Sequence, residues 1–287
     1  MIVAGGKTFV PRTSDEALDI WAAAPEARLV AGGTDLLVRL KDVLVWPPLI
    51  DLSHVDGLRG ITCDDGVLRV GACTTYTELE RNALIARHVN VLVEAAREVG
   101  SPAVRNRGTL AGNLANASPA GDTIPALYAL EAELELRSRA GQRTVPVTEF
   151  FCGPGRTVLQ SQELICAVRI PVRAGWRGAF ERLGQRAALT ISKVSAAVCV
   201  RLENDIVREA RIALGAVAPT VVRAREAEAQ LCGAPLSDEA CAHAGEAAAR
   251  AASPITDIRS DAAYRRAMCA VLVRDALRRC RAAGGAS

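Results

Sequence analysis

Two loops of small residues, rather than a set of catalytic side chains, are the part of this sequence whose residue types could do chemistry. The longer loop, Gly100 to Pro125, consists almost wholly of small residues and turn formers, with Arg105 and Arg107 and no acidic residue before Asp122. Small residues let main-chain N–H groups approach an anion closely, and successive N–H groups in turns form a concave donor surface. A second glycine turn, Ala31 to Asp35, lies far upstream. Two such cradles predict a ligand with a pyrophosphate in its middle.

Other phosphate-binding and catalytic patterns are missing from the sequence. The composition of the two loops does not by itself require a ligand, because clusters of Gly, Asn, Ser and Pro are most often plain loops. There is no P-loop and no G-x-G-x-x-G opening a helix, which excludes a Rossmann site. His54, His88 and His243 stand alone, and no Ser/His/Asp or Cys/His arrangement is visible. We therefore nominate no catalytic residue and no metal ligand.

The cysteines exclude a further class of site. All nine are scattered, without a C-x-x-C pair or a Cys/His cluster. Because Fe–S clusters need closely grouped thiolates, this chain is not expected to hold one by itself. An odd number of cysteines in a large chain is typical of reduced, mostly buried thiols.

Length and charge narrow the function classes. A chain of 287 residues is long enough for two or three compact units. Its net charge is only +3, with both signs interspersed and few aromatic residues, which argues against nucleic-acid binding. No apolar run is long enough to span a bilayer, and the start of the chain lacks a secretory signal. We expect a cytoplasmic protein without membrane insertion.

The first half of the chain predicts a mixture of short helices and strands around the two loops. The capping-box pattern Thr13-Ser14-Asp15-Glu16 predicts a helix over 14–24, and strands over 28–31 and 49–52 surround the glycine turn. A helix over 89–99 is expected to stop at Gly100, and Asp122 is expected to cap a short helix that contains Pro125. Further strands are expected over 67–73, 132–137, 145–147 and 163–171, and a further helix over 74–84.

The pattern changes after residue 171. Three β segments over 178–183, 194–202 and 207–217, joined by short turns, predict an antiparallel sheet of three strands. Helices are expected over 224–231, 238–252 and 261–281. The apolar stripe of the last helix is typical of core packing rather than of a cofactor site.

Several motifs, in order, resemble one known family. These are 31–37 (AGGTDLL), 107–113 (RGTLAGN), 116–122 (NASPAGD), 150–157 (FFCGPGRT) and the strand over 163–171. They resemble the flavoprotein subunit of the molybdenum hydroxylases, the xanthine dehydrogenase and carbon monoxide dehydrogenase family, whose medium subunit binds FAD. The resemblance covers nearly the whole chain and implies an α+β fold. That fold has two FAD-binding subdomains of the vanillyl-alcohol-oxidase/PCMH type, over 1–56 and 57–172, and a C-terminal flavoprotein domain over 173–287.

The resemblance also implies where FAD binds. Residues 31–35 and 109–113 would hold the pyrophosphate mainly through backbone N–H groups, with the Thr109 hydroxyl and the Asn113 amide assisting. Asp122 matches the family's acidic residue near the ribityl or ribose hydroxyls, and Ile165 matches an apolar position against the isoalloxazine. The complete set of expected FAD-binding residues is Val30, Ala31, Gly32, Gly33, Thr34, Asp35, Leu36, Val99, Thr109, Leu110, Ala111, Gly112, Asn113, Asp122, Ile165, Arg182 and Lys193.

Three members of that set, Arg182, Val99 and Lys193, lie outside the matching motifs. Arg182 falls near a position that is often Lys in the family, although the surrounding loop aligns only with a one-residue gap. Val99 stands where some relatives place an aromatic residue beside the adenine. Lys193 is a rare choice in a strand and could lie near the N1/O2 edge of the flavin. Each has an ordinary structural interpretation as a core or surface residue.

The expected function follows from the family. The chain would be an electron-transfer subunit whose FAD accepts electrons from an Fe–S partner and passes them to NAD+, quinone or oxygen. A small subunit with 2Fe–2S clusters and a large molybdopterin subunit would complete a heterotrimer, either single or doubled. Two alternatives stay open: a noncatalytic assembly subunit with a vestigial FAD site, and a stand-alone FAD reductase that resembles the cell-wall UDP-sugar reductases.

Overall fold

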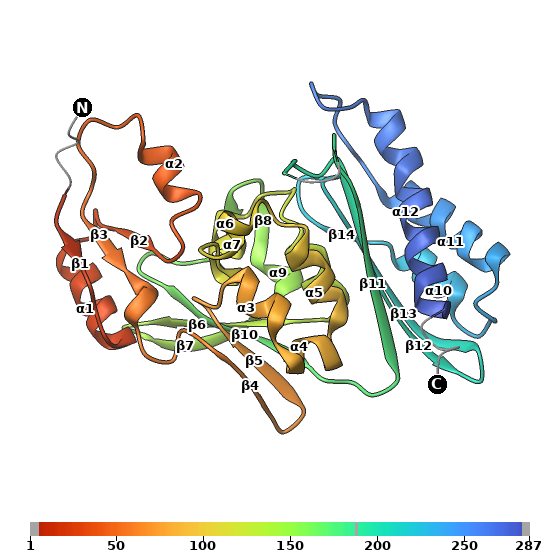
Figure 1. Cartoon of the computed structure of the whole chain (residues 1–287), viewed down its shortest axis with the longest axis horizontal. Coiled ribbons are helices and arrows are strands. Elements are labelled where there is room, and N and C mark those ends of the chain that lie inside the picture. The colour runs from red at the N-terminus through yellow and green to blue at the C-terminus, as the bar shows by residue number, and fades with distance from the viewer. Residues whose placement is uncertain (1–5, 187–188, 283–287) are drawn as a thin grey trace.

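Three main β-sheets follow one another along the chain, each with its own helices. The computed structural model describes residues 6–186 and 189–282. Figure 1 shows the N-terminal sheet at one end, the central sheet in the middle and the C-terminal sheet with its long helices at the other end. No helix among these residues is long and apolar enough to cross a membrane.

The N-terminal unit is a small parallel sheet. Its strands are β1 (Thr8–Phe9), β2 (Arg28–Val30) and β3 (Leu49–Asp51), in the order β1-β3-β2. Helix α1 (Ser14–Ala23) begins where predicted because the Thr13 hydroxyl accepts from the Glu16 N–H. Strand β2 leads directly into the glycine turn, and a short helix that the sequence pattern did not predict, α2 (Leu36–Leu40), follows it. The turn η1 (Leu52–His54) leaves this unit.

The central unit is a five-stranded antiparallel sheet. Its strands are β4 (Ile61–Asp64), β5 (Val67–Gly71), β6 (Glu133–Ser138), β7 (Gly141–Pro146) and β10 (Leu164–Pro171). The order is β4-β5-β10-β6-β7, which places β10, a strand predicted from alternating apolar residues, at the centre. A small hairpin of β8 (Phe151–Gly153) and β9 (Arg156–Thr157) follows helix α9 (Val147–Phe150).

Helices between β5 and β6 carry the longer loop of the sequence. They are α3 (Tyr76–Arg81), α4 (Ala83–His88), α5 (Asn90–Arg97), α6 (Pro102–Arg105), α7 (Leu110–Asn116) and α8 (Thr123–Ala129). The helix predicted over 74–84 is thus wrong at its end: Asn82 closes α3 and caps α4 instead. Gly100 follows the α5 helix with a φ of +50°, a left-handed conformation that suits glycine at a helix end.

Two details of the 100–125 stretch differ from the predictions. Residues expected to form one open loop include α6 and α7, because Ser101 and Thr109 each accept a hydrogen bond from a backbone N–H three residues on. Asp122 precedes α8, but its side chain does not cap that helix. Asp122 therefore holds the predicted N-cap position of a helix that contains Pro125, but the predicted capping hydrogen bond is not formed.

The C-terminal sheet has four antiparallel strands rather than the three predicted. The strands are β11 (Trp176–Leu183), β12 (Val194–Glu203), β13 (Ile206–Gly215) and β14 (Val222–Arg223), in that order. Strand β14 has only two residues, which is too short to show alternation in the sequence. Helices α10 (Arg225–Leu231) and α12 (Ala262–Ala282) lie against this sheet, and α11 (Asp238–Ala251) packs against both of them (Figure 1).

The C-terminal sheet is buried on both faces. One face packs against the hydrophobic core that the N-terminal and central units share, and the other against the core formed with the C-terminal helices. Alternate residues of β12 point to opposite sides, so Ala197 and Cys199 pack with the central core while Val198 and Val200 pack with the C-terminal helices. Helices α5 and α8 of the central unit lie against this sheet. The two units therefore share a continuous packed junction.

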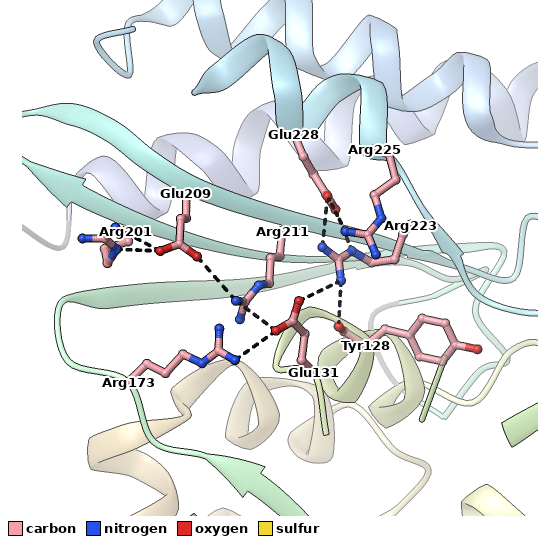
Figure 2. Close-up of polar contacts among 9 residues, drawn as sticks. All are labelled: Tyr128, Glu131, Arg173, Arg201, Glu209, Arg211, Arg223, Arg225 and Glu228. Atoms are coloured by element: carbon pink, nitrogen blue, oxygen red, sulfur yellow. Dashed lines mark hydrogen bonds and ion pairs between the residues drawn. The ribbon is translucent and has the colours of Figure 1, made fainter. Parts of the chain in front are cut away.

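Ion pairs reinforce that junction (Figure 2). The Glu131 carboxylate lies 3.0 Å from a guanidinium nitrogen of Arg173 and 3.0 Å from one of Arg211. Arg223 pairs with Glu228 at 2.6 Å and also donates to the Tyr128 carbonyl at the end of α8, at 3.3 Å. These contacts tie β13, β14 and α10 to the central unit.

Candidate functional site

The two loops singled out in the sequence border one cavity. Gly33, from the turn after β2, and Gly112, from α7, both line an open cavity of about 260 Å³ between the N-terminal and central units. Twelve of the expected FAD-binding residues line it: Val30, Ala31, Gly32, Gly33, Thr34, Asp35, Leu36, Thr109, Ala111, Gly112, Asn113 and Ile165. Two loops that lie far apart in the sequence thus meet at one site.

Close backbone contact holds the loops together. A Cβ atom added to Gly32 would lie 2.0 Å from the carbonyl oxygen of Arg107 and 2.7 Å from its carbon. No other residue than glycine fits this approach without moving the backbone of one loop. Gly33 adds a left-handed φ of +75°, which turns the chain from β2 toward α2.

The first loop presents free backbone donors. Within residues 6–186 and 189–282, the N–H groups of residues 32–36 make no hydrogen bond to the chain. Five successive free donors around a turn with a positive φ make a concave anion site of the nest type. This loop is therefore ready to receive an oxyanion.

The second loop uses its donors within the protein. The Leu110 N–H donates to the Thr74 carbonyl at 3.1 Å, the Ala111 N–H to Ala72 at 3.3 Å and the Gly112 N–H to the Thr109 hydroxyl at 3.1 Å. What this loop offers to the cavity is close, side-chain-free backbone at Gly112 and the side chain of Asn113.

A polar chain of side chains links the two loops at the cavity wall. The Asn116 amide nitrogen donates to Asp35 Oδ1 at 3.3 Å, and the Arg39 guanidinium donates to the Asn116 oxygen. The Asp35 carboxylate, whose charge would repel a phosphate, is thus bound by the Asn116 amide, while the Asp35 N–H stays free. Arg39 borders the cavity and contributes a positive charge.

Arg39 and Asn116 were not predicted as site residues. A signal was present in the sequence, since Arg39 lies one helical turn after Asp35 and Asn116 lies one turn after Gly112. Using that signal requires knowing that both segments are helical, and α2 and α7 were not predicted.

The other wall of the cavity is apolar. Ile165 at 7% exposure and Leu164 at 1% come from β10, and Tyr76 from α3 is 4% exposed. Glu163 also lines this wall, but its carboxylate receives two hydrogen bonds from Arg143, at 2.7 and 2.8 Å. Those bonds hold the pKa of Glu163 below its usual range, so its carboxylate stays ionised and paired with Arg143.

Five of the expected residues lie away from the cavity lining. Leu110 is buried in the core, and Val99 packs against that core. Lys193 lies over the ring of Tyr264, with its ammonium 5.9 Å from the ring centre. Arg182 and Asp122 contact one another across the junction between the central and C-terminal units.

Asp122 is a buried carboxylate bound to the C-terminal unit. The Ser192 hydroxyl donates to its Oδ1 at 2.6 Å, and Arg182 lies 3.5 Å from its Oδ2 while also pairing with Glu98 at 2.6 Å. Burial raises the pKa of Asp122 to about 6, although the Ser192 hydrogen bond and the Arg182 charge act in the opposite direction.

This pKa predicts a pH-dependent stability. An unfolded aspartate has a pKa of about 3.9, so between about pH 4 and pH 6 the folded state holds a proton that the unfolded state has lost. Stability from this group therefore falls as the pH rises through that window, by at most about 3 kcal/mol. Arg182, Glu98 and Ser192 are the groups that face the carboxylate.

Urea unfolding of the wild type and of Asp122→Asn at pH 4.5 and pH 8 checks this. We expect the free energy of unfolding of the wild type, relative to the variant, to be lower at pH 8 by about 2 kcal/mol. A difference between the two proteins that is the same at both pH values would contradict the assignment.

The cavity fits a dinucleotide with a diphosphate and a flat apolar end. Free N–H groups and Arg39 suit the anion, while Ile165, Leu164 and Tyr76 suit an aromatic ring system. Among the described residues, no group of three or more His, Cys, Asp or Glu side chains could hold a metal ion.

Comparison with known protein families also indicates a dinucleotide-binding chain. Residues 4–173 match the family described as the FAD binding domain in molybdopterin dehydrogenase, and residues 179–280 match the CO dehydrogenase flavoprotein C-terminal domain. The chain is 32% identical over 257 residues to the xanthine dehydrogenase FAD-binding subunit of Escherichia coli O157:H7, which covers 88% of each chain. It is 35% identical over 256 residues to the carbon monoxide dehydrogenase medium chain of Hydrogenophaga pseudoflava, again with 88% of each covered.

Solved structures share the whole fold. A chain of the carbon monoxide dehydrogenase from Hydrogenophaga pseudoflava superposes with a TM-score of 0.92 at 34% identity, covering 98% of this chain and 99% of that one. A chain of quinoline 2-oxidoreductase from Pseudomonas putida 86 gives a TM-score of 0.92 at 31% identity, with 98% of each covered. This chain therefore belongs to the family of FAD-binding medium subunits of the molybdenum hydroxylases and is an oxidoreductase subunit of the xanthine dehydrogenase and carbon monoxide dehydrogenase type.

Proposed function

We propose that this chain binds FAD in the cavity between Gly33 and Gly112 and passes electrons from an Fe–S partner subunit to an external acceptor. The run of free N–H groups over residues 32–36, facing a cavity that the second loop closes, is the observation that carries the proposal. Bound FAD would supply the redox chemistry, and the chain would supply binding, orientation and electrostatics.

The cavity residues take distinct roles in this proposal. Donors of residues 32–36 would bind the pyrophosphate, Arg39 would offset its charge, and Ile165 would pack against the isoalloxazine. Thr109 would mainly hold the second loop in shape, because its hydroxyl accepts a hydrogen bond from the Gly112 N–H. Roles for Val99, Leu110, Asp122, Arg182 and Lys193 at the flavin stay predictions, as does the division of the chain at residues 56 and 172.

The partners follow from the relatives. The matched relatives are named as a medium chain and as an FAD-binding subunit, which implies further subunits. We propose a small subunit with 2Fe–2S clusters and a large molybdopterin subunit, in a single or a doubled heterotrimer. The acceptor would be NAD+, quinone or oxygen, and the substrate would bind on the large subunit.

Co-expression of the chain with the two partner subunits from its native host tests the proposal. We expect the purified complex to carry one FAD per copy of this chain, together with iron and molybdenum. We also expect reduction of the flavin by the substrate of the large subunit only when the Fe–S subunit is present. A complex without flavin, or flavin reduction that is independent of the Fe–S subunit, would contradict it.

A further inference from the structure

Thr123 lies outside the cavity lining but contacts a residue that belongs to it. We propose that Thr123 is a positioning residue for the FAD site: it orients the Asn113 amide so that Nδ2 donates to an oxygen of bound FAD. This inference rests on the proposed function. It concerns a hydroxyl that the structure buries completely and that does not line the cavity itself.

The contact between the two side chains fixes which end of the amide is free. The Thr123 hydroxyl donates to Asn113 Oδ1 at 2.8 Å. An amide oxygen that accepts this bond leaves the amide nitrogen with two donors. Within the described ranges 6–186 and 189–282, Nδ2 of Asn113 has no hydrogen-bond partner. Asn113 lines the cavity, so these donors are available to a ligand there.

The backbone around Gly121 restricts the same amide. A Cβ atom at Gly121 would lie 3.0 Å from both Nδ2 and Oδ1 of Asn113 and 2.8 Å from Ile124 Cδ1. The glycine lets the chain before α8 pack directly against the amide plane. With the Thr123 hydroxyl on one atom and this backbone beside the plane, the amide is held before the ligand arrives, which saves the cost of ordering it on binding.

The position of Thr123 in the chain couples the site to the C-terminal unit. The carboxylate of its neighbour Asp122 accepts a hydrogen bond from the Ser192 hydroxyl, and Ser192 lies two residues before the start of β12. The start of α8 is thereby fixed from two sides, by the central unit through Asn113 and by the C-terminal unit through Ser192. The C-terminal unit, of which no described residue (173–186 and 189–282) lines the cavity, supports the cavity through this start of α8.

FAD titration of the full-length apoprotein tests the role of the hydroxyl. Thr123→Val keeps the shape of the side chain and removes the hydroxyl donor. We expect this variant to raise the Kd for FAD about tenfold, since the Asn113 side chain must then be ordered on binding. Thr123→Ser restores the donor and is expected to bind within about twofold of the wild type. Should Thr123→Val not fold, Thr123→Ala carries the same comparison.

A matched control separates positioning from general stability. Thr74 is also completely buried, and its hydroxyl bonds to the backbone of Gly60 at 3.2 Å without lining the cavity. Thr74→Val should lower the melting temperature of the apoprotein as Thr123→Val does, but leave the Kd for FAD within about twofold of the wild type. An equal loss of affinity in both variants would overturn the proposal, because it would reflect stability alone.

A double-mutant cycle identifies the route of the effect. If Thr123 acts through Asn113, Thr123→Val should weaken FAD binding about tenfold in the wild type and by less than about twofold in Asn113→Ala. A tenfold effect in both backgrounds would overturn the inference while leaving the FAD site in place. If the wild-type apoprotein binds no FAD, the proposed function itself fails, and this inference fails with it.

Discussion

Replacing Gly32 by alanine is expected to weaken FAD binding by the full-length chain about a hundredfold. The added Cβ would stand 2.0 Å from the Arg107 carbonyl oxygen, which is backbone and cannot swing away as a side-chain end could. One loop must therefore move, and the concave row of N–H donors that begins at Gly32 would leave the cavity wall. Overpacking of this kind costs about 3 kcal/mol, which corresponds to about a hundredfold rise in the Kd for FAD.

The measurement is FAD titration of the apoprotein, with thermal unfolding as a second readout. Gly57→Ala is the control for a Cβ added without a clash, since no heavy atom lies within 4 Å of a Cβ at Gly57; unlike Gly32, Gly57 has a left-handed φ, of +75°. That variant should lose stability of about 1 kcal/mol from its backbone conformation and bind FAD normally. Gly32→Ala protein with wild-type affinity for FAD would show that the two loops need not touch.

Gly112 gives a useful contrast within the same cavity. A Cβ there would meet only the Thr109 hydroxyl, at 2.8 Å, and a side-chain oxygen can move. The two glycines look alike in the sequence, yet only Gly32 faces a neighbouring backbone. Close approach between distant segments is a tertiary property, and the sequence shows only that a small residue stands at each position.

Local patterns explain which parts of the fold could be predicted. Helix α1, strand β10 and the long helices α11 and α12 depend on capping and periodicity, which are written into consecutive residues. Strand β14 has two residues and pairs only because β13 presents a free edge. Its existence depends on the neighbouring strand, so the three-stranded prediction was wrong.

Partners far apart in the sequence explain which parts of the site could not be predicted. Asp122 precedes a helix and has the residue type of an N-cap, but Ser192 and Arg182 bind its carboxylate from another unit. The loop around Gly112 similarly has the composition of a donor cradle. Its donors are nevertheless committed to Thr74, Ala72 and Thr109, because that segment folds as α7 against the core.

The second large effect is expected at the junction of the units, where Glu228→Ala should destabilise the protein. Glu228 is 6% exposed and receives two hydrogen bonds from Arg223, at 2.6 and 3.0 Å (Figure 2). It also accepts one from the Ile212 N–H, at 2.8 Å. Removing the carboxylate leaves Arg223, whose side chain is 7% exposed, as a buried charge without its main partner. Breaking a buried pair from one side costs about 3–5 kcal/mol.

Two control variants separate this cost from the loss of any charge on α10. Glu226 lies on the same helix and pairs with Arg250, but both side chains are more than half exposed, so Glu226→Ala should cost less than about 1 kcal/mol. Replacing Glu228 by Leu and Arg223 by Met together removes both buried charges, and the free energy of unfolding should then return to within about 2 kcal/mol of the wild type. Denaturant unfolding of the three variants measures these changes in the free energy of unfolding.

If Glu228→Ala cost as little as Glu226→Ala, the buried charge of Arg223 would be compensated by other partners. The remaining candidates are the Tyr128 carbonyl at 3.3 Å and Glu131 at 3.9 Å.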